Sequence, residues 1–130
     1  MVYIQNNIID LLIRIKNGQI AKKKQIFCQK TNKNENLLKL LELEGYISTF
    51  WIEKNQLKIA LKYTYSEPVV SNIILYSKPS KKIYITFNRL KKLIKLNKIR
   101  TIFLHTNKGI ITNKLALKSK IGGELICKIE

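Results

Sequence analysis

The spacing of apolar residues changes along the first half of the chain, and this change limits the folds that the half can adopt. Near the N-terminus apolar residues recur every three or four positions: Ile4, Ile8, Leu11, Leu12 and Ile15. This spacing predicts an amphipathic helix, which we expect to end at Gly18. In QLKIALKY, residues 56–63, apolar and polar residues alternate instead, which predicts a strand with one buried face. A helix and a one-faced strand must cover each other, so this half should form a layered unit.

The other elements of this half follow from turn and cap signals. A short strand is expected over Gln25–Gln29, and a second helix begins after Thr31 as N-cap, with Asn32 or Asn34 as alternatives. Gly45 ends that helix. A hairpin follows, with a strand over Tyr46–Glu53 and a turn at residues 54–55. The predicted order is therefore α-β-α-β-β.

The stretch TYSEP, residues 64–68, is the predicted boundary between two modules, 1–66 and 67–130, because Pro68 breaks strand pairing. In the second module a short basic helix is expected near residues 88–95. Strands are expected over 70–76, 82–86, 100–104, 109–112 and 125–129. The predicted fold class is α+β, with an N-terminal α-β-α-β-β layer and a mostly antiparallel β module that carries one short helix.

The chain is strongly basic, with 25 lysine and arginine residues against 8 acidic residues and a net charge of +17. Such self-repulsion destabilises a compact protein unless a polyanion offsets it. Residues 1–66 carry 11 basic and 5 acidic side chains (+6), and residues 67–130 carry 14 and 3 (+11). Nucleic acid is therefore the expected partner, with more of its contacts in the second half.

Catalytic chemistry is poorly supported by the sequence. His105 is the only histidine, the acids are scattered, and no phosphate-binding glycine loop is present. Cys28 and Cys127 lack the spacing of a zinc site, so we expect buried thiols in a reducing compartment. No apolar run has the roughly 18 residues that span a membrane. We therefore expect no enzyme activity, metal, cofactor, small-molecule substrate, signal peptide or membrane contact.

Lysines cluster at two places that could hold phosphate. Lys30 and Lys33 lie at the start of the second helix with Thr31, where free backbone N–H groups favour anions, although a solvated lysine is the alternative for each. In KPSKKIY, residues 78–84, Lys78 and Lys82 accompany Tyr84. The tyrosine can stack on a base or pack within the sheet.

The stretch from His105 to Glu124 has two further candidate segments. In HTNKG, Thr106 and Asn107 offer donors and acceptors, Lys108 offers charge, and Gly109 allows a positive φ at a turn between strands. The second segment is IGGE, in which Gly122 and Gly123 permit close backbone approach and Glu124 can accept from a base amino group. An ordinary hairpin with a flexible connection explains both segments equally well.

Together these residues resemble a known family. NKGIITNKLALKSKIGGELIC, residues 107–127, is similar to the closing signature of the bacterial-type ribosomal protein S8 family. IIDLLIRIKNGQIAKK, LLELEGYI and SKPSKKIY resemble the family's opening helix, second helix end and Arg-Pro-Gly-x-Arg-x-Tyr segment. The resemblance covers essentially the whole chain. It implies a two-module protein of the small ribosomal subunit that binds rRNA, contacts neighbouring ribosomal proteins and has no catalytic activity.

The resemblance also implies which residues contact RNA. Positions that match the family's motifs are Asp10, Arg14, Asn17, Gly18, Tyr84, Thr106, Lys108, Gly109, Thr112, Gly122, Gly123 and Glu124. Others depart from them. His105 and Asn107 stand at serine positions, Asn113 at an aspartate and Ser80 at a glycine, and lysine replaces arginine at 16, 78 and 82. Lysine keeps the charge but loses the planar fork of arginine.

Two other classes of protein remain as alternatives: a free regulatory RNA-binding protein and a nucleic-acid-processing enzyme. The composition also indicates the kind of genome that encodes the chain. Lysine outnumbers arginine 22 to 3, and isoleucine and asparagine are abundant. These residues have A/T-rich codons. We therefore expect a mitochondrial small subunit, with a plastid or an A/T-rich bacterium as alternatives.

Overall fold

The chain divides into two compact units, Met1–Asn72 and Ile73–Glu130, which we call unit 1 and unit 2. The computed structural model describes residues 2–70, 72–76, 81–97 and 101–129. The division lies later in the chain than the predicted boundary between residues 66 and 67. A small hairpin spans that predicted boundary, because β4 (Tyr63–Thr64) pairs with β5 (Glu67–Pro68) within unit 1.

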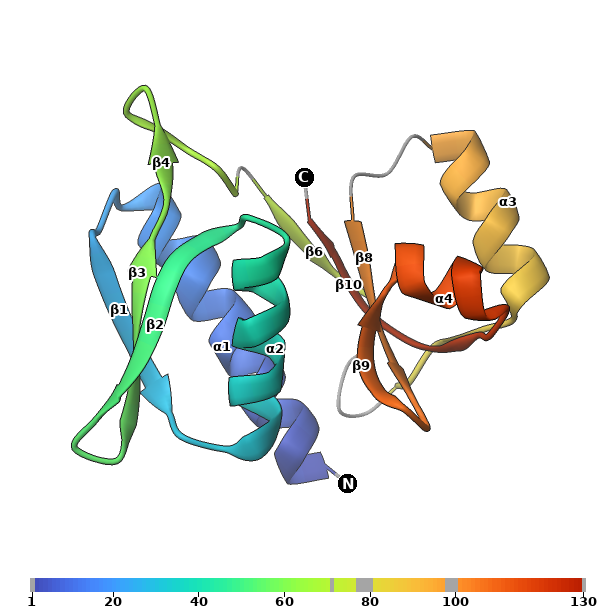
Figure 1. Ribbon diagram of the computed structural model, residues 1–130, viewed down its shortest axis with the longest axis horizontal. Coiled ribbons are helices and arrows are strands. Elements are labelled where there is room, and N and C mark those ends of the chain that lie inside the picture. The colour runs from blue at the N-terminus through green and yellow to red at the C-terminus, as the bar shows by residue number, and fades with distance from the viewer. Residues whose placement is uncertain (1, 71, 77–80, 98–100, 130) are drawn as a thin grey trace. The chain divides into compact units, whose positions relative to one another are not determined.

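Unit 1 is a layer of two helices on a three-stranded antiparallel sheet. Its other elements are α1 (Val2–Ile20), β1 (Gln25–Gln29), α2 (Asn32–Leu43), β2 (Ile47–Glu53) and β3 (Gln56–Leu61). The strand order is β1-β3-β2, so β1 and β2 are edge strands. Figure 1 shows α1 and α2 side by side against one face of this sheet. The predicted order α-β-α-β-β is confirmed.

The core of unit 1 follows the two periodicities of the sequence. Along β3, Leu57, Ile59 and Leu61 are buried, whereas the residues between them are more exposed. Residues of α1, α2 and β3 with almost no exposed surface are Leu11, Leu12, Ile15, Leu37, Leu38, Leu41, Leu57 and Ile59. Each such side chain contributes about 1.5–3 kcal/mol by leaving water. This burial holds the helices on the sheet.

Gly18 does not end α1, so that prediction is wrong. A Cβ at Gly18 would lie 2.7 Å from Ile26 Cγ2 and 2.9 Å from Leu61 Cδ1. The glycine therefore lets the helix approach β1 and β3 closely. Lys22, at φ 55°, adopts the left-handed conformation just after the helix ends.

The other local signals of unit 1 are confirmed. Thr31 is the N-cap of α2, and its Oγ1 accepts a hydrogen bond from the N–H of Asn34 at 3.1 Å. Asn34, one of the alternative caps, instead donates from Nδ2 to the Gln29 carbonyl at 2.9 Å. Lys54 and Asn55 both have positive φ, 50° and 62°, as a two-residue hairpin turn requires.

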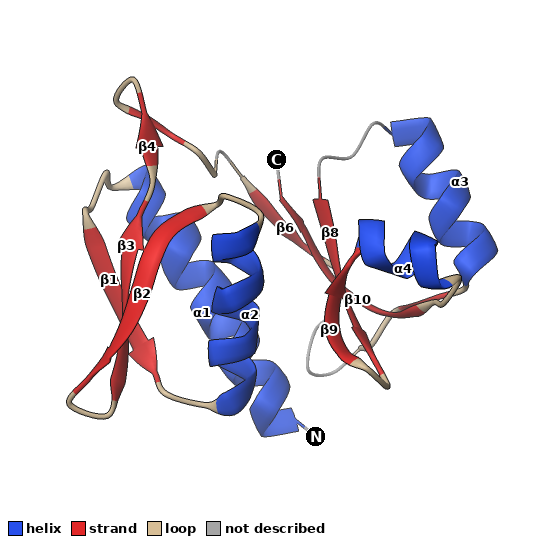
Figure 2. Ribbon diagram, viewed as in Figure 1, coloured by secondary structure: helices blue, strands red, loops and turns tan. Residues whose placement is uncertain are grey.

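Unit 2 is an antiparallel sheet with two helices on one face (Figure 2). Its strands are β6 (Ile73–Leu75), β7 (Tyr84–Ile85), β8 (Thr101–Thr106), β9 (Gly109–Thr112) and β10 (Gly123–Ile129). The order is β6-β10-β8-β9, and β7 also pairs with β10. The helices are α3 (Phe87–Asn97) and α4 (Asn113–Ser119). The predicted antiparallel module with a basic helix is confirmed, and the α+β class with it.

The residue patterns did not predict α4 as an element. It has only seven residues and buries few of them, Ala116 among them, so its apolar period is too short to detect. Strand ends also differ from the predictions. β6 covers three residues of the predicted 70–76, and β10 begins two residues before Leu125. The core of unit 2 consists of Leu90, Ile102, Leu104, Ile111, Ala116 and Leu125.

Both cysteines are free and buried, as predicted. Burial raises the pKa of the Cys28 thiol to about 11, the largest of several effects on that group. Burial also raises the pKa of the Cys127 thiol well above its ordinary value. Both thiols are therefore protonated and unreactive at neutral pH.

Replacing Thr31 tests its role as a cap. We expect Thr31→Ala to lower the free energy of unfolding by about 1 kcal/mol, because the N–H of Asn34 loses its acceptor. Thr31→Ser keeps the hydroxyl and should retain most of the stability. Urea denaturation measures both variants. Equal stability of the two would contradict the capping role.

Candidate nucleic-acid interface

Three candidate side chains form one row across the sheet of unit 2. In the register of β10, Glu124 lies opposite Tyr84 of β7 on one side and His105 of β8 on the other. Directly opposed residues point to the same face of a sheet. Leu104 and Leu125, the next pair along, belong to the core beneath the helices, so the row lies on the opposite face.

Exposure differs sharply along this row. The Tyr84 side chain is 69% exposed, whereas Glu124 is only 5% exposed and His105 is partly buried. The alternative that Tyr84 packs within the sheet is therefore wrong. Its ring is accessible to a base or ribose, while the Glu124 carboxylate lies between its neighbours and is not presented to solvent.

A tight turn projects beside this row. β8 and β9 are joined at Asn107 and Lys108, and Gly109 has φ +94° as predicted. The Thr106 hydroxyl donates to the Gly109 carbonyl at 3.0 Å and accepts from the Lys108 N–H at 3.1 Å. Thr106 therefore shapes the turn. The exposed side chains at its tip are those of Asn107 and Lys108.

Gly122 and Gly123, the glycine pair, pack closely against β7 and β8 beside the row and the turn. A Cβ at Gly122 would lie 2.2 Å from the Ile85 carbonyl oxygen, and one at Gly123 would lie 2.7 Å from both the His105 carbonyl oxygen and Thr106 Cγ2. The close backbone approach expected here is thus made by β7 and β8. Any larger residue would push β10 away from one of these strands.

The structure describes only some of the lysines in the KPSKKIY segment. Lys82 is exposed, two residues before Tyr84 in the chain. Lys78 lies outside the described residues. The structure therefore places two charges of this segment, those of Lys81 and Lys82, and both side chains are exposed.

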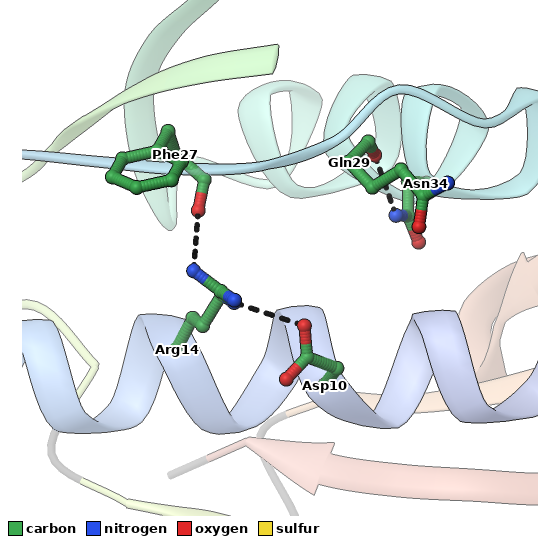
Figure 3. A network of polar contacts seen from close by, with 5 residues as sticks. All are labelled: Asp10, Arg14, Phe27, Gln29 and Asn34. Carbon is green, nitrogen blue, oxygen red and sulfur yellow. Dashed lines mark hydrogen bonds and ion pairs between the residues drawn. The ribbon is translucent and has the colours of Figure 1, made fainter. Parts of the chain in front are cut away.

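The remaining candidates, Arg14, Lys30, Thr31 and Lys33, belong to unit 1 and form a separate set. Arg14 is committed to contacts within the protein (Figure 3): its Nε lies 2.9 Å from Asp10 Oδ2 and its Nη1 donates to the Phe27 carbonyl at 3.3 Å. Its guanidinium also lies 5.6 Å from the centroid of the Phe27 ring. Arg14 therefore caps an outward carbonyl of the edge strand β1.

Two hollows were not among the predicted sites. One, of about 330 Å³, lies between α1 and β1 and includes Arg14, Asn17, Lys23 and Phe27 in its wall. The other, of about 370 Å³, is lined by Asn88, Lys91, Lys92 and Lys95 of α3. Spacings of three, four and seven place these four residues on one helix face, a signal that the sequence already contained.

Metal and membrane features are not found in the described part of the chain. None of its groups of histidine, cysteine and acidic residues could hold a metal ion with three ligands. No helix among these residues is both long and apolar enough to cross a membrane.

Comparison with known proteins decides the family. The family model for ribosomal protein S8 matches residues 6–129. This chain belongs to the ribosomal protein S8 family.

Relatives of the S8 family match the chain over nearly its whole length. The small ribosomal subunit protein uS8 of Nitratidesulfovibrio vulgaris strain DP4 is 34% identical over 122 residues, covering 94% of this chain and 95% of the relative. The uS8 protein of Buchnera aphidicola subsp. Baizongia pistaciae is 35% identical and covers 96% and 97%. The uS8c protein of Oltmannsiellopsis viridis is 33% identical and covers 92% and 94%. The predicted family resemblance is confirmed.

Two positions of the S8 closing signature have structural roles in this chain. Thr112, 5% exposed, is the N-cap of α4 and accepts from the Leu115 N–H at 3.4 Å. Asn113, which stands where the family has aspartate, is equally buried, and its Oδ1 accepts from the Ile102 N–H at 3.3 Å. Either an amide or a carboxylate oxygen can accept this bond, so the replacement preserves the junction of β8 and α4.

Alanine at the glycines separates close packing from turn strain. We expect Gly122→Ala to destabilise unit 2 by about 3 kcal/mol or more, because its methyl group meets the backbone of Ile85. Gly109→Ala has open space around it and should cost only the left-handed conformation, about 1–2 kcal/mol. Urea denaturation compares the two, and a smaller loss for Gly122→Ala would disprove the packing argument.

Proposed function

We propose that this S8-family protein is a structural component of the small ribosomal subunit and that unit 2 binds the rRNA directly. The observation that carries the proposal is the register of β10, in which Glu124 lies between the exposed Tyr84 and His105, the residue just before the Thr106–Gly109 turn. The net charge of +17 supports a polyanionic partner. Neighbouring small-subunit proteins are the other partners.

The exposed side chains have different roles in binding RNA, which follow from their chemistry. Lys108 and Lys82 are exposed and neutralise phosphates, which positions the protein without reading sequence. Asn107 donates and accepts at the tip of the turn, and it hydrogen-bonds a ribose 2′-OH or a base edge. Tyr84 packs on a base or sugar. The glycine pair and Glu124 support these groups from within the sheet.

The S8 family is a family of ribosomal proteins and not of enzymes, and we propose that this chain likewise has no catalytic activity. Its role is to hold folded RNA. A processing enzyme is the rival reading, and Glu124 is its best candidate acid. Cleavage of rRNA by the purified protein, lost in Glu124→Gln, would support that rival and overturn the proposal.

We further propose that the subunit is mitochondrial. The excess of lysine over arginine supports an A/T-rich genome, and an organellar uS8c protein is among the relatives together with bacterial ones. Sucrose gradients of fractionated cells test the proposal. We expect the protein to cosediment with the mitochondrial small subunit. Recovery with plastid or bacterial subunits would correct the compartment, and recovery away from ribosomes would favour a free regulator.

Variants at the turn test the division between phosphate and base contacts. We expect Asn107→Ala to weaken binding to small-subunit rRNA of the same genome by about 1 kcal/mol, roughly fivefold, and to leave binding to a generic RNA duplex unchanged. Lys108→Ala should weaken both and reduce the salt slope by about 0.7–0.9. Filter binding across salt concentrations measures these effects.

Lys54→Ala is the matched control, because it removes the same charge from a hairpin turn of unit 1. It should leave the salt slope nearly unchanged. Equal losses for Asn107→Ala on both RNAs would show that the turn does not read structure.

A further inference from the structure

The hairpin of β4 and β5 presents an aromatic ring that the fold of unit 1 does not use. Thr64 pairs with Glu67, so Tyr65 and Ser66 form the turn between them. The Tyr65 side chain is 97% exposed. Figure 1 shows this hairpin projecting beyond the three-stranded sheet of unit 1.

The backbone of this turn is strained. Tyr65 and Ser66 both have positive φ, 52° and 66°, a conformation that two-residue hairpin turns satisfy with asparagine and glycine. A bulky side chain there is a genuine outlier. Because the ring is almost fully exposed, packing within the described part of the chain does not offset this strain. Strained residues of this kind cluster at ligand contacts, so the strain at Tyr65 points to a contact with a partner.

Positive charge lies at the base of the same hairpin. The Tyr63 hydroxyl donates to the Lys23 carbonyl, which ties the hairpin to the run Lys22–Lys24. All three lysines of this run are exposed. They outnumber Glu67, the acid of the hairpin, by three charges to one. Tyr65 lies two residues beyond the anchor, about 7 Å along a strand.

This arrangement matches the chemistry of unpaired RNA. Proteins bind single-stranded segments by stacking bases on exposed aromatic rings while a basic surface follows the backbone. An acidic peptide would neutralise the lysines, but it would not stack on the exposed Tyr65 ring as a base does. Duplex RNA would offer phosphates and no free base face.

We propose that Tyr65 and the Lys22–Lys24 run form a second RNA contact, in which the tyrosine ring stacks on an unpaired base of the small-subunit rRNA. The lysines neutralise the adjoining phosphates. This contact rests on the proposed function, since it names a further RNA feature that the protein recognises. It lies in unit 1, so its loss can be separated from loss of the contact through unit 2.

Tyr65→Gly is the sharpest test, because the two effects of the substitution have opposite signs. Glycine relieves the positive φ, so we expect the Tm to rise by a few degrees in a thermal melt. Glycine also removes the ring, so affinity of the full-length protein for small-subunit rRNA of the same genome should fall on the order of tenfold. Tyr65→Phe keeps the ring and should bind like the unmodified protein.

Leu43→Ala is the matched control, because Leu43 is another exposed apolar residue of unit 1, 81% exposed and outside the hairpin. It should change neither the melt nor the affinity. Ultraviolet crosslinking in purified small subunits, followed by mass spectrometry, should recover a peptide that contains Tyr65 joined to an unpaired nucleotide.

The outcomes separate this contact from the proposed function. If Tyr65→Gly binds rRNA normally while Asn107→Ala and Lys108→Ala lose affinity, the second contact is wrong and the proposed function stands. If Tyr65→Gly binds free rRNA normally but no longer cosediments with small subunits, the hairpin contacts a protein and the RNA contact is wrong. If the unmodified protein does not bind the rRNA, both proposals fail.

Discussion

The close approach of β10 to β7 and β8 at the glycine pair is the constraint on which the candidate interface depends. Gly122 meets the backbone of Ile85, and Gly123 meets that of His105, with no room for a Cβ on either side. Because β10 is held this closely, Glu124 lies between Tyr84 and His105 in one register. A wider spacing would separate the tyrosine from the Thr106–Gly109 turn. Gly122 and Gly123 therefore set the geometry of the candidate interface through packing within the protein.

Charge imposes a second constraint on both units. Arg14 forms a salt bridge with Asp10, and it lies at a partly exposed site where such a pair contributes little. With 25 basic side chains against 8 acidic ones, the acids are too few to offset the repulsion among the basic groups. On α3, lysines spaced three and four residues apart destabilise the helix slightly. Bound RNA offsets this cost, so the compact state should be most favourable within the ribosome.

Polar residues have two different roles in this fold. Thr31, Thr112 and Asn113 satisfy backbone N–H groups at helix and strand ends, and Arg14 caps a carbonyl of an edge strand. These groups prevent unpaired backbone atoms and unwanted edge pairing. Asn107, Lys108 and Tyr84 are instead exposed. A family motif thus combines residues that build the surface with residues that can touch the partner.

Local patterns in the sequence determined the helices of unit 1, its hairpin, the cap at Thr31 and the positive φ of Gly109, because each depends on neighbouring residues. The closing signature also identified the family. The uninterrupted path of α1 through Gly18 and the burial of Glu124 could not be predicted, since each depends on residues distant in the chain, and α4 was missed because its apolar period is too short to detect. The sequence alone determined most of the elements, the charge and the candidate residues. Only the tertiary structure decided which of them face solvent, because strand register and close packing arise when distant segments meet.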